Sequence, residues 1–345
     1  MSQEPFTMVT PPGRTRRVGA GQVLGVLCLL AAAGALAWAL RDTAEPEPPR
    51  RTASDVLTSP PVAPFLLFAN MSPDAYRRVA LVPLGAPGGP RYVTSLVCDR
   101  VHMANGRGIC LTTTLEGVVT VHRAHLMDAA FHVTAAIALT GVPSRARMSP
   151  DGRLAAVTVF ESGHGYSDAG FSTRTTILDA VRGTEIGHLE QFTVLRDGRP
   201  FSAVDFNFWG VTFAADSDRF FATLATGGAA HLVEGRVRER RVRLTGARGE
   251  CPSLSPGNRR LAYKHRVAGT NAWQIHVLDL DTQQVTPLEG ETRSVDDQVE
   301  WLDDTHVLYH VTGAGGADVW QLDATSPSAP PSRVIQFAYS PAIVR

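Results

Sequence analysis

Few side chains in this sequence have the spacing that metal chemistry requires. His122 and His125 lie three residues apart, with His132 nearby, in a segment of extended character. Residues three apart on a strand point to opposite faces, so these histidines are not expected to converge on one ion. Four aspartates could attract a hard cation such as calcium, namely Asp296, Asp297, Asp303 and Asp304. They flank a short segment in two predicted turns, where aspartate is an ordinary residue, so we expect no metal and no other cofactor.

A loop rich in glycine and serine is the first candidate for a contact surface. It covers residues 161–171 and offers His164, Tyr166 and Asp168. Long loops on a rigid scaffold often carry recognition, so these side chains are predicted to contact a partner. The surrounding glycines do not provide the rigid support that catalysis needs. A mobile linker loop is the alternative interpretation.

An arginine-rich segment is the second candidate. Strand alternation would place Arg236, Arg238 and Arg240 on one face. That face could bind an anionic partner such as lipid headgroups. The alternative is the solvated outermost strand of a sheet, whose charges deter pairing with another edge.

The composition limits the classes of function. The chain has 33 basic and 33 acidic residues, so it has no global field that would attract nucleic acid. A hydrophobic fraction of 44% is enough for a sizeable core. No Gly-x-Ser-x-Gly motif of serine hydrolases occurs in the sequence.

An apolar segment near the N-terminus predicts a membrane anchor. Residues 18–40 carry no charged side chain and would rise about 34 Å as a helix, enough to cross a bilayer. Arg14, Arg16 and Arg17 precede this segment, so residues 1–17 are a predicted cytoplasmic leader and the rest of the chain lies outside. Residues 41–64 are a proline-rich linker. Cleavage of the segment as a secretory signal is the alternative.

The cysteines agree with an oxidising exterior. If residues 97–103 and 109–113 form neighbouring antiparallel strands around the Asn105-Gly106 turn, Cys98 and Cys110 face each other. We therefore predict a disulfide between them, with two buried free thiols as the alternative. Cys251 is then left as a small core residue.

Beyond Pro64 the chain consists of short apolar runs separated by turn signals. In Ser149-Pro150-Asp151-Gly152-Arg153 the proline suits the first corner of a tight turn and the glycine suits a positive φ. Related turns recur, and the six predicted turns lie near residues 104, 149, 214, 255, 303 and 340. A four-stranded propeller blade takes about 40 to 45 residues, so six turns predict six blades.

The two ends of this region together supply the four strands of one predicted blade. Residues 65–69, 77–84 and 91–96 form three predicted strands with no entering strand before them. Residues 336–340 are an orphan strand that would become the innermost strand of the first blade and close the ring. We therefore predict an all-β six-bladed β-propeller over residues 65–345, preceded by one transmembrane helix. A β-sandwich or two small β domains are the alternatives.

Several segments also resemble a known family. Residues 149–155 and 275–281 are similar to the PD40 repeats of TolB-like six-bladed propellers. Residues 250–256 and 296–302 resemble a membrane-anchored bacterial branch of that family whose function is unknown. This sequence departs from the repeat at Gly257-Asn258, where Asp-Gly is usual, and at Asp303-Asp304, which lacks the proline. The resemblance implies the fold, and the TolB namesakes bind partner proteins in the periplasm.

These features predict a non-catalytic binding propeller that is tethered to the cytoplasmic membrane and displayed outside it. Its expected partner is another envelope protein or a small ligand, with no nucleic acid. The alternative is a propeller hydrolase or lactonase whose acidic and histidine side chains converge from several blades at the central channel. A sensor that signals through a partner inside the cell is a third possibility.

Overall fold

The computed structural model describes residues 56–161, 172–313 and 316–345. The predicted leader over residues 1–17, the predicted membrane segment over residues 18–40 and most of the linker lie outside the described residues. Residues 162–171, which include His164, Tyr166 and Asp168, also lie outside them. In the ranges that are described, no helix is long and apolar enough to cross a membrane.

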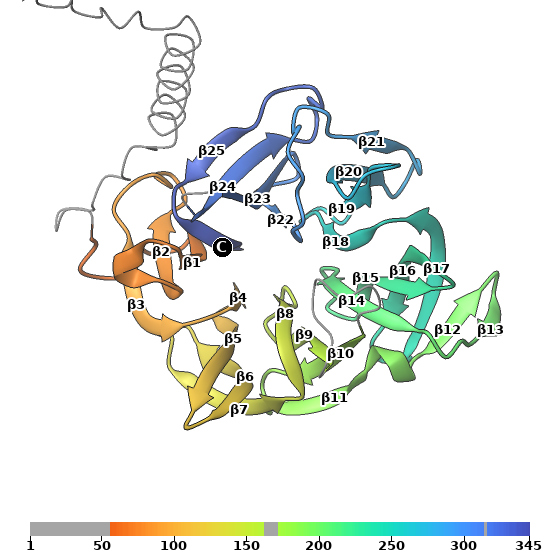
Figure 1. Ribbon diagram of the computed structural model, residues 1–345, viewed down its shortest axis with the longest axis horizontal. Coiled ribbons are helices and arrows are strands. Elements are labelled where there is room, and N and C mark those ends of the chain that lie inside the picture. The colour runs from red at the N-terminus through yellow and green to blue at the C-terminus, as the bar shows by residue number, and fades with distance from the viewer. Residues whose placement is uncertain (1–55, 162–171, 314–315) are drawn as a thin grey trace, which may run out of the picture. The chain divides into compact units, whose positions relative to one another are not determined.

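The described residues form six sheets arranged around a centre, antiparallel except for one strand pair, which are the blades of a six-bladed β-propeller (Figure 1). The inner strand of each blade faces the centre, and the other strands follow outward. In this order, blade 1 consists of β26 (Ala338–Val344), β1 (Phe65–Asn70), β2 (Arg78–Pro83) and β3 (Tyr92–Val97). Blade 2 consists of β4 (Arg100–Ala104), β5 (Arg107–Glu116), β6 (Val119–Asp128) and β7 (Val133–Leu139). Blade 3 consists of β8 (Gly141–Met148), β9 (Leu154–Glu161), β10 (Thr173–Asp179) and β11 (Thr184–His188).

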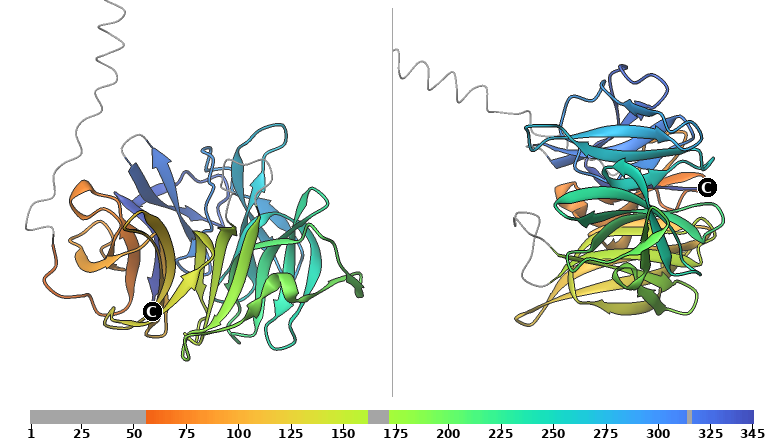
Figure 2. Two further views of the ribbon diagram at one scale, coloured as in Figure 1. Left: turned by 60° about the horizontal axis from the view of Figure 1, so that its bottom comes forward. Right: turned by 90° about the vertical axis from the view of Figure 1, so that its right-hand side faces the viewer.

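Blades 4 to 6 follow the same order around the ring. Blade 4 contains β14 (Asn207–Phe213), β15 (Arg219–Thr226), β16 (Ala229–Arg236) and β17 (Arg241–Arg248). Blade 5 consists of β18 (Glu250–Leu254), β19 (Arg260–Arg266), β20 (Trp273–Asp279) and β21 (Val285–Pro287). Blade 6 consists of β22 (Glu300–Trp301), β23 (His306–Gly313), β24 (Gly316–Asp323) and β25 (Ser332–Ile335). Two short 3-10 helices, η2 (Pro73–Ala75) and η3 (Leu189–Gln191), lie in connections. Side views show turns at both ends of the blades (Figure 2).

The predicted turn motif joins the first two strands of blade 3. Gly152 has a φ of 69° and donates its N–H to the Ser149 carbonyl oxygen at 2.9 Å. The Ser149 hydroxyl donates to Asp151 and accepts from the Leu154 N–H at 2.9 Å. The side chains of the motif therefore satisfy the backbone groups that the turn exposes.

The two departures from the repeat still join paired strands, although the turn of blade 6 is one residue shorter, with Trp301 opposite Val307 where blade 3 has Met148 opposite Ala155. In blade 5, Asn258 takes the positive φ, at 59°, because asparagine tolerates this region better than most residues. In blade 6, the Asp303 carboxylate accepts the N–H groups of Thr305 and His306 at 2.7 and 2.8 Å, and this caps the turn without a proline. Both turns connect paired strands, β18 with β19 and β22 with β23.

The predicted closure of the ring is confirmed. Strand β26 pairs antiparallel with β1, with Val344 opposite Phe65 and Ala338 opposite Asn70. The strand spans Ala338–Val344, so it begins and ends later than residues 336–340. Blade 1 is therefore built from both ends of the propeller sequence, and no inner strand is missing at the seam.

Blade 4 carries an addition that the repeat does not predict. Strands β12 (Thr193–Arg196) and β13 (Arg199–Phe201) form a hairpin around a turn at Asp197-Gly198. Strand β12 then pairs parallel with β17, which makes this sheet six-stranded. Strand β17 is therefore an internal strand of its sheet and not an outermost edge.

Apolar side chains fill the space between blades. One cluster joins Ile177 of blade 3 to Phe208 and Phe220 of blade 4, and all three are fully buried. The aromatic side chain of Phe208 thus packs between blades. Cys251 is also buried, and a Cβ on Gly210 (φ 67°) would lie 2.8 Å from its Cα, so the bulge in β14 requires glycine.

Candidate functional site

The prediction that Arg236, Arg238 and Arg240 share one strand face is wrong. Strand β16 ends at Arg236, residues 237–240 form a turn, and β17 begins at Arg241. Arg240 has a φ of 48° and donates from Nη2 to the Ile186 carbonyl oxygen at 2.6 Å. The turn contains none of the residues that usually signal one, so alternation alone suggested a continuous strand.

The arginines of this hairpin lie beside acidic residues. Arg236 Nη1 lies 3.2 Å from Asp216 Oδ2 and 3.4 Å from Asp218 Oδ2. Arg238 Nε lies 3.9 Å from Asp218 Oδ1. The local field for an anionic partner is therefore weaker than the count of arginines indicates.

The predicted disulfide between Cys98 and Cys110 is present, with a Cα–Cα distance of 5.4 Å. Its setting differs from the prediction, because β4 begins at Arg100 and Cys110 lies opposite Val101. Cys98 belongs to the short connection from blade 1 to blade 2. The bridge therefore ties that connection to the second strand of blade 2.

The histidines of β6 act as hydrogen-bonding partners within their sheet. His122 Nδ1 lies 3.0 Å from the Thr113 hydroxyl, and His125 Nε2 lies 3.2 Å from the Thr112 hydroxyl. In the described ranges no three His, Cys, Asp or Glu side chains form a group that could hold a metal ion.

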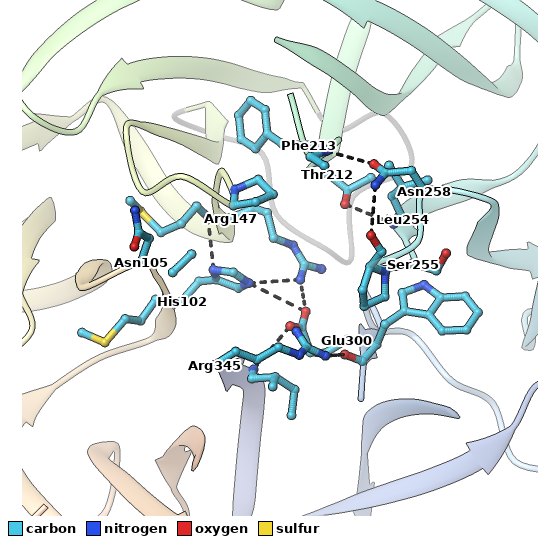
Figure 3. Close-up of a pocket in the computed structure, with 18 residues that line it drawn as sticks. His102, Asn105, Arg147, Thr212, Phe213, Leu254, Ser255, Asn258, Glu300 and Arg345 are labelled. Carbon is cyan, nitrogen blue, oxygen red and sulfur yellow. Dashed lines mark hydrogen bonds and ion pairs between the residues drawn. The ribbon is translucent and has the colours of Figure 1, made fainter. Parts of the chain in front are cut away.

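A cavity of about 340 Å³ opens where the inner strands of the blades end (Figure 3). We call it the channel mouth. All six blades contribute to its lining, which is mostly apolar. Its apolar side chains include Met148, Phe213, Ala215, Leu254, Trp301 and Ile343.

Three side chains from three blades form the floor of the channel mouth. Arg147 of β8 donates from Nη1 to Glu300 Oε2 of β22 and from Nη2 to the Val299 carbonyl oxygen at 3.1 Å. His102 of β4 lies with Nε2 3.7 Å from the same carboxylate oxygen (Figure 3). Burial opposes ionisation of Glu300, but Arg147 and His102 outweigh it and lower its pKa to about 2.

Both ring nitrogens of His102 face protein groups. Its Nδ1 accepts the Met148 N–H at 3.2 Å, and its Nε2 lies 3.2 Å from Arg147 Nη1 and 3.7 Å from Glu300 Oε2. Burial lowers the pKa of His102, with Arg147 adding to this effect and Glu300 opposing it. Both ring nitrogens are therefore engaged by protein groups.

The rim of the channel mouth is a chain of hydrogen bonds between neighbouring turns. Asn105 Nδ2 of blade 2 donates to the Asp151 carbonyl oxygen of blade 3 at 2.9 Å. The Ala215 N–H of blade 4 donates to Asn258 Oδ1 of blade 5 at 2.9 Å. The Gly257 N–H donates to Asp304 Oδ1 of blade 6 at 2.6 Å. These links fix the turns relative to one another, which is the preorganisation that a binding site needs.

A second polar layer lies where the inner strands begin. His310 Nδ1 lies 2.6 Å from Asp297 Oδ2, and the His310 ring packs on Tyr339 with a centroid distance of 4.5 Å. Gln298 Nε2 donates to the carbonyl oxygens of Val211 and Pro252 at 3.0 and 2.8 Å, which links blades 4, 5 and 6. Asp297 is thus an ionic partner inside the ring and not only a turn residue.

Comparisons with known proteins bear on the fold. No family model and no curated protein matches the sequence. TolB from Acinetobacter baumannii aligns with a TM-score of 0.57 and 13% identity, over 82% of this chain and 67% of that one. A functionally unknown protein from Desulfotomaculum acetoxidans DSM 771 aligns with a TM-score of 0.50 and 11% identity, over 82% and 99%.

A puromycin-hydrolyzing peptidase from Mycobacterium tuberculosis aligns with a TM-score of 0.51 and 13% identity. The alignment covers 81% of this chain and 44% of the peptidase, so this chain spans less than half the length of that protein. Proteins with quite different descriptions thus share the architecture. The comparisons confirm the predicted resemblance as a likeness of fold, and the chain has the architecture of TolB-type six-bladed propellers.

Proposed function

We propose that this protein is a non-catalytic binding propeller that engages a partner protein or a small ligand at the channel mouth. The observation that carries the proposal is the cavity itself, which all six blades line and whose rim is tied together by hydrogen bonds. Apolar walls with a few oriented polar groups are typical of ligand sites.

The floor of the cavity supports binding over catalysis. A general base needs an unengaged nitrogen or oxygen within reach of the substrate. His102 uses Nδ1 for the Met148 N–H, its Nε2 lies beside both Arg147 and Glu300, and Glu300 is held ionised by Arg147. The hydrolase alternative requires three or more acidic or histidine side chains that converge. In the described part of the chain, His102 pairs with Glu300 and Asp297 with His310, while Asp296 and Glu250 are held by Lys264.

We further propose that the propeller is held outside the cytoplasmic membrane by residues 18–40. The arginines before that segment and its apolar length support this orientation. The Cys98–Cys110 disulfide supports an oxidising compartment.

Site-specific photocrosslinking of the full chain in its native cells tests the binding site. A photoreactive residue at Ala215, on the exposed rim, is expected to capture one stoichiometric partner, or a bound ligand is expected to co-purify and be detected by mass spectrometry. The matched control is the same residue at Val181, which is 56% exposed in the turn between β10 and β11 of blade 3. Ala215→Trp, which fills the mouth, is expected to reduce capture or co-purification at least tenfold. Equal capture at Ala215 and Val181 would contradict the proposal. So would an experiment that recovers neither a crosslinked partner nor a bound ligand.

A further inference from the structure

The added hairpin of blade 4 belongs to a group of basic side chains that we call the blade 4 arginine group. It consists of Arg196 of β12, Arg199 of β13 and Arg248 of β17, together with His231 of β16. Figure 1 shows β12 and β13 at the outer edge of this blade. The three arginines are exposed, and their guanidinium groups form no hydrogen bond or ion pair with any described residue. Their charge is therefore available to a partner.

Strand pairing places these basic side chains directly opposite one another. Arg196 is the partner of Arg199 in the hairpin, and His231 is the partner of Arg248 across β16 and β17. The Cβ atoms of such residues lie about 5 Å apart, and like charges in this arrangement are destabilising. The two pairs are neighbours, because burial and then the charges of Arg248 and Arg196 lower the pKa of His231. The sheet thus concentrates positive charge at a cost to its own stability.

The acidic residues of this region do not neutralise the arginines. The Asp205 carboxylate accepts the Thr226 hydroxyl and the Gly227 N–H, both at 2.7 Å. Glu234 is paired with two other arginines of the blade. Asp197 lies in the turn of the hairpin and forms no ion pair within the described part of the chain. One aspartate beside three arginines leaves a positive excess.

Aromatic and apolar side chains accompany the arginines. The Arg196 guanidinium lies 3.6 Å from the centroid of the Phe201 ring, and the Phe201 and Phe206 rings are 5.3 Å apart between centroids. Val204, in the connection from β13 to β14, is fully exposed. Stacking on a ring restricts the guanidinium before a partner arrives, so less conformational freedom is lost on binding. Arginine together with aromatic side chains is typical of the centre of a protein–protein interface.

We propose that the blade 4 arginine group binds an acidic segment of a partner protein, whose carboxylates meet Arg196, Arg199 and Arg248. Guanidinium groups match carboxylates with two parallel hydrogen bonds. Bound carboxylates would also remove the repulsion between Arg196 and Arg199, so the complex regains stability that the free sheet lacks. An anionic membrane fits less well, because lipid surfaces are usually bound by clusters of about four to eight basic residues. This surface lies at the outer edge of the ring and is separate from the channel mouth.

Fluorescence polarisation with the full chain in detergent micelles tests the binding. The probe is a fluorescein-labelled peptide rich in glutamate and phenylalanine, and the comparison peptide carries glutamine in place of glutamate. The glutamate peptide is expected to bind more tightly, and the double variant Arg196→Gln and Arg248→Gln should weaken its binding about tenfold or more. The control is Arg182→Gln with Arg259→Gln, two exposed arginines that already have acidic partners, and it should leave binding unchanged.

Three outcomes of this experiment would overturn the proposal. The first is an equal affinity for the two peptides, including no binding of either. The second is an equal loss of affinity in the two double variants. The third is arginine-dependent binding to phosphatidylglycerol vesicles that is tighter than binding to the glutamate peptide, since the surface would then serve a membrane.

A stability measurement separates binding from support of the fold. Arg199→Glu replaces a pair of like charges by a pair of opposite charges. The thermal unfolding midpoint of the full chain is therefore expected to rise by about 1–2 °C at low salt, while binding of the glutamate peptide is lost. A midpoint that does not rise, or binding that survives the substitution, would contradict the assignment. Neither measurement involves the channel mouth, so this proposal and the proposed function can fail separately.

Discussion

Glu300 and Glu190 are both buried carboxylates, but they lie in different regions of the propeller. Glu300 lies in the channel floor, where Arg147 and His102 lower its pKa to about 2. Glu190 lies in η3 against blade 3, where burial raises its pKa to about 7 despite the Thr175 N–H that it accepts at 3.0 Å. Its Oε2 is buried without a partner among the described residues. Partners, and not depth, therefore decide whether a buried acid is ionised here.

The largest effect is expected from removing the channel carboxylate. Glu300→Ala leaves Arg147 buried without its counter-charge, so the free energy of unfolding should fall by about 3–5 kcal/mol at pH 7. Urea denaturation measures the change. A Glu300→Leu and Arg147→Met double variant, which removes both charges, is expected to be close to the unaltered protein. A loss below about 1 kcal/mol in the single variant would show that the pair is not buried as described.

A smaller effect on the free energy of unfolding is expected for Glu190, and its dependence on pH is opposite to that of Glu300. Its folded pKa of about 7 lies above the ordinary value of 4.5, so the folded state holds the proton more tightly. Its contribution to stability is therefore full below about pH 4.5 and is lost as the pH rises through 7, by at most ~3 kcal/mol. Glu300 behaves in the opposite way, since its contribution is lost as the pH falls toward 2.

Glu190→Gln is the variant that isolates this contribution. Urea denaturation between pH 4.5 and pH 8 should show a smaller loss of stability in the variant than in the unaltered chain. Other titrating groups are common to both proteins and cancel in the difference. Parallel pH profiles would mean that Glu190 is ionised throughout and that the contrast with Glu300 is absent.

The smallest effect is expected at a pair that is not buried. Arg182 is 76% exposed in its side chain and lies 2.7 Å from Asp179. Arg182→Gln should change the free energy of unfolding by less than about 1 kcal/mol, and added salt should reduce the change further. A loss comparable to that of Glu300→Ala would remove the distinction between solvated and channel ion pairs.

The features that the sequence predicts correctly are local or repeated. The Ser149–Arg153 turn, its relatives and the Cys98–Cys110 bridge each depend on residues within a short stretch, and repetition then predicts six blades. The channel floor depends on His102, Arg147 and Glu300, which come from three blades and approach only when the ring closes. A signal for them exists, because each lies between apolar residues two or three positions before a blade turn.

In two regions the structure differs from the sequence predictions, and each difference has a physical reason. The turn at residues 237–240 relies on Arg240 in the left-handed region, which no local preference favours. The parallel pairing of β12 with β17 joins segments from either side of four intervening strands of the same sheet. Neither turn chemistry nor alternation can report such a pairing.

The pairing of β26 with β1 has a consequence for the order of assembly. Phe65 and Val344 face each other across almost the whole propeller sequence, so their contact has a very large sequence separation. During synthesis, blades 2 to 6 can collapse in turn, but the first sheet lacks its inner strand until residues 338–344 have left the ribosome. Contacts of this kind form slowly because a long loop must close first. A chain that still lacks this segment would therefore present a nearly complete ring with one exposed edge on β1.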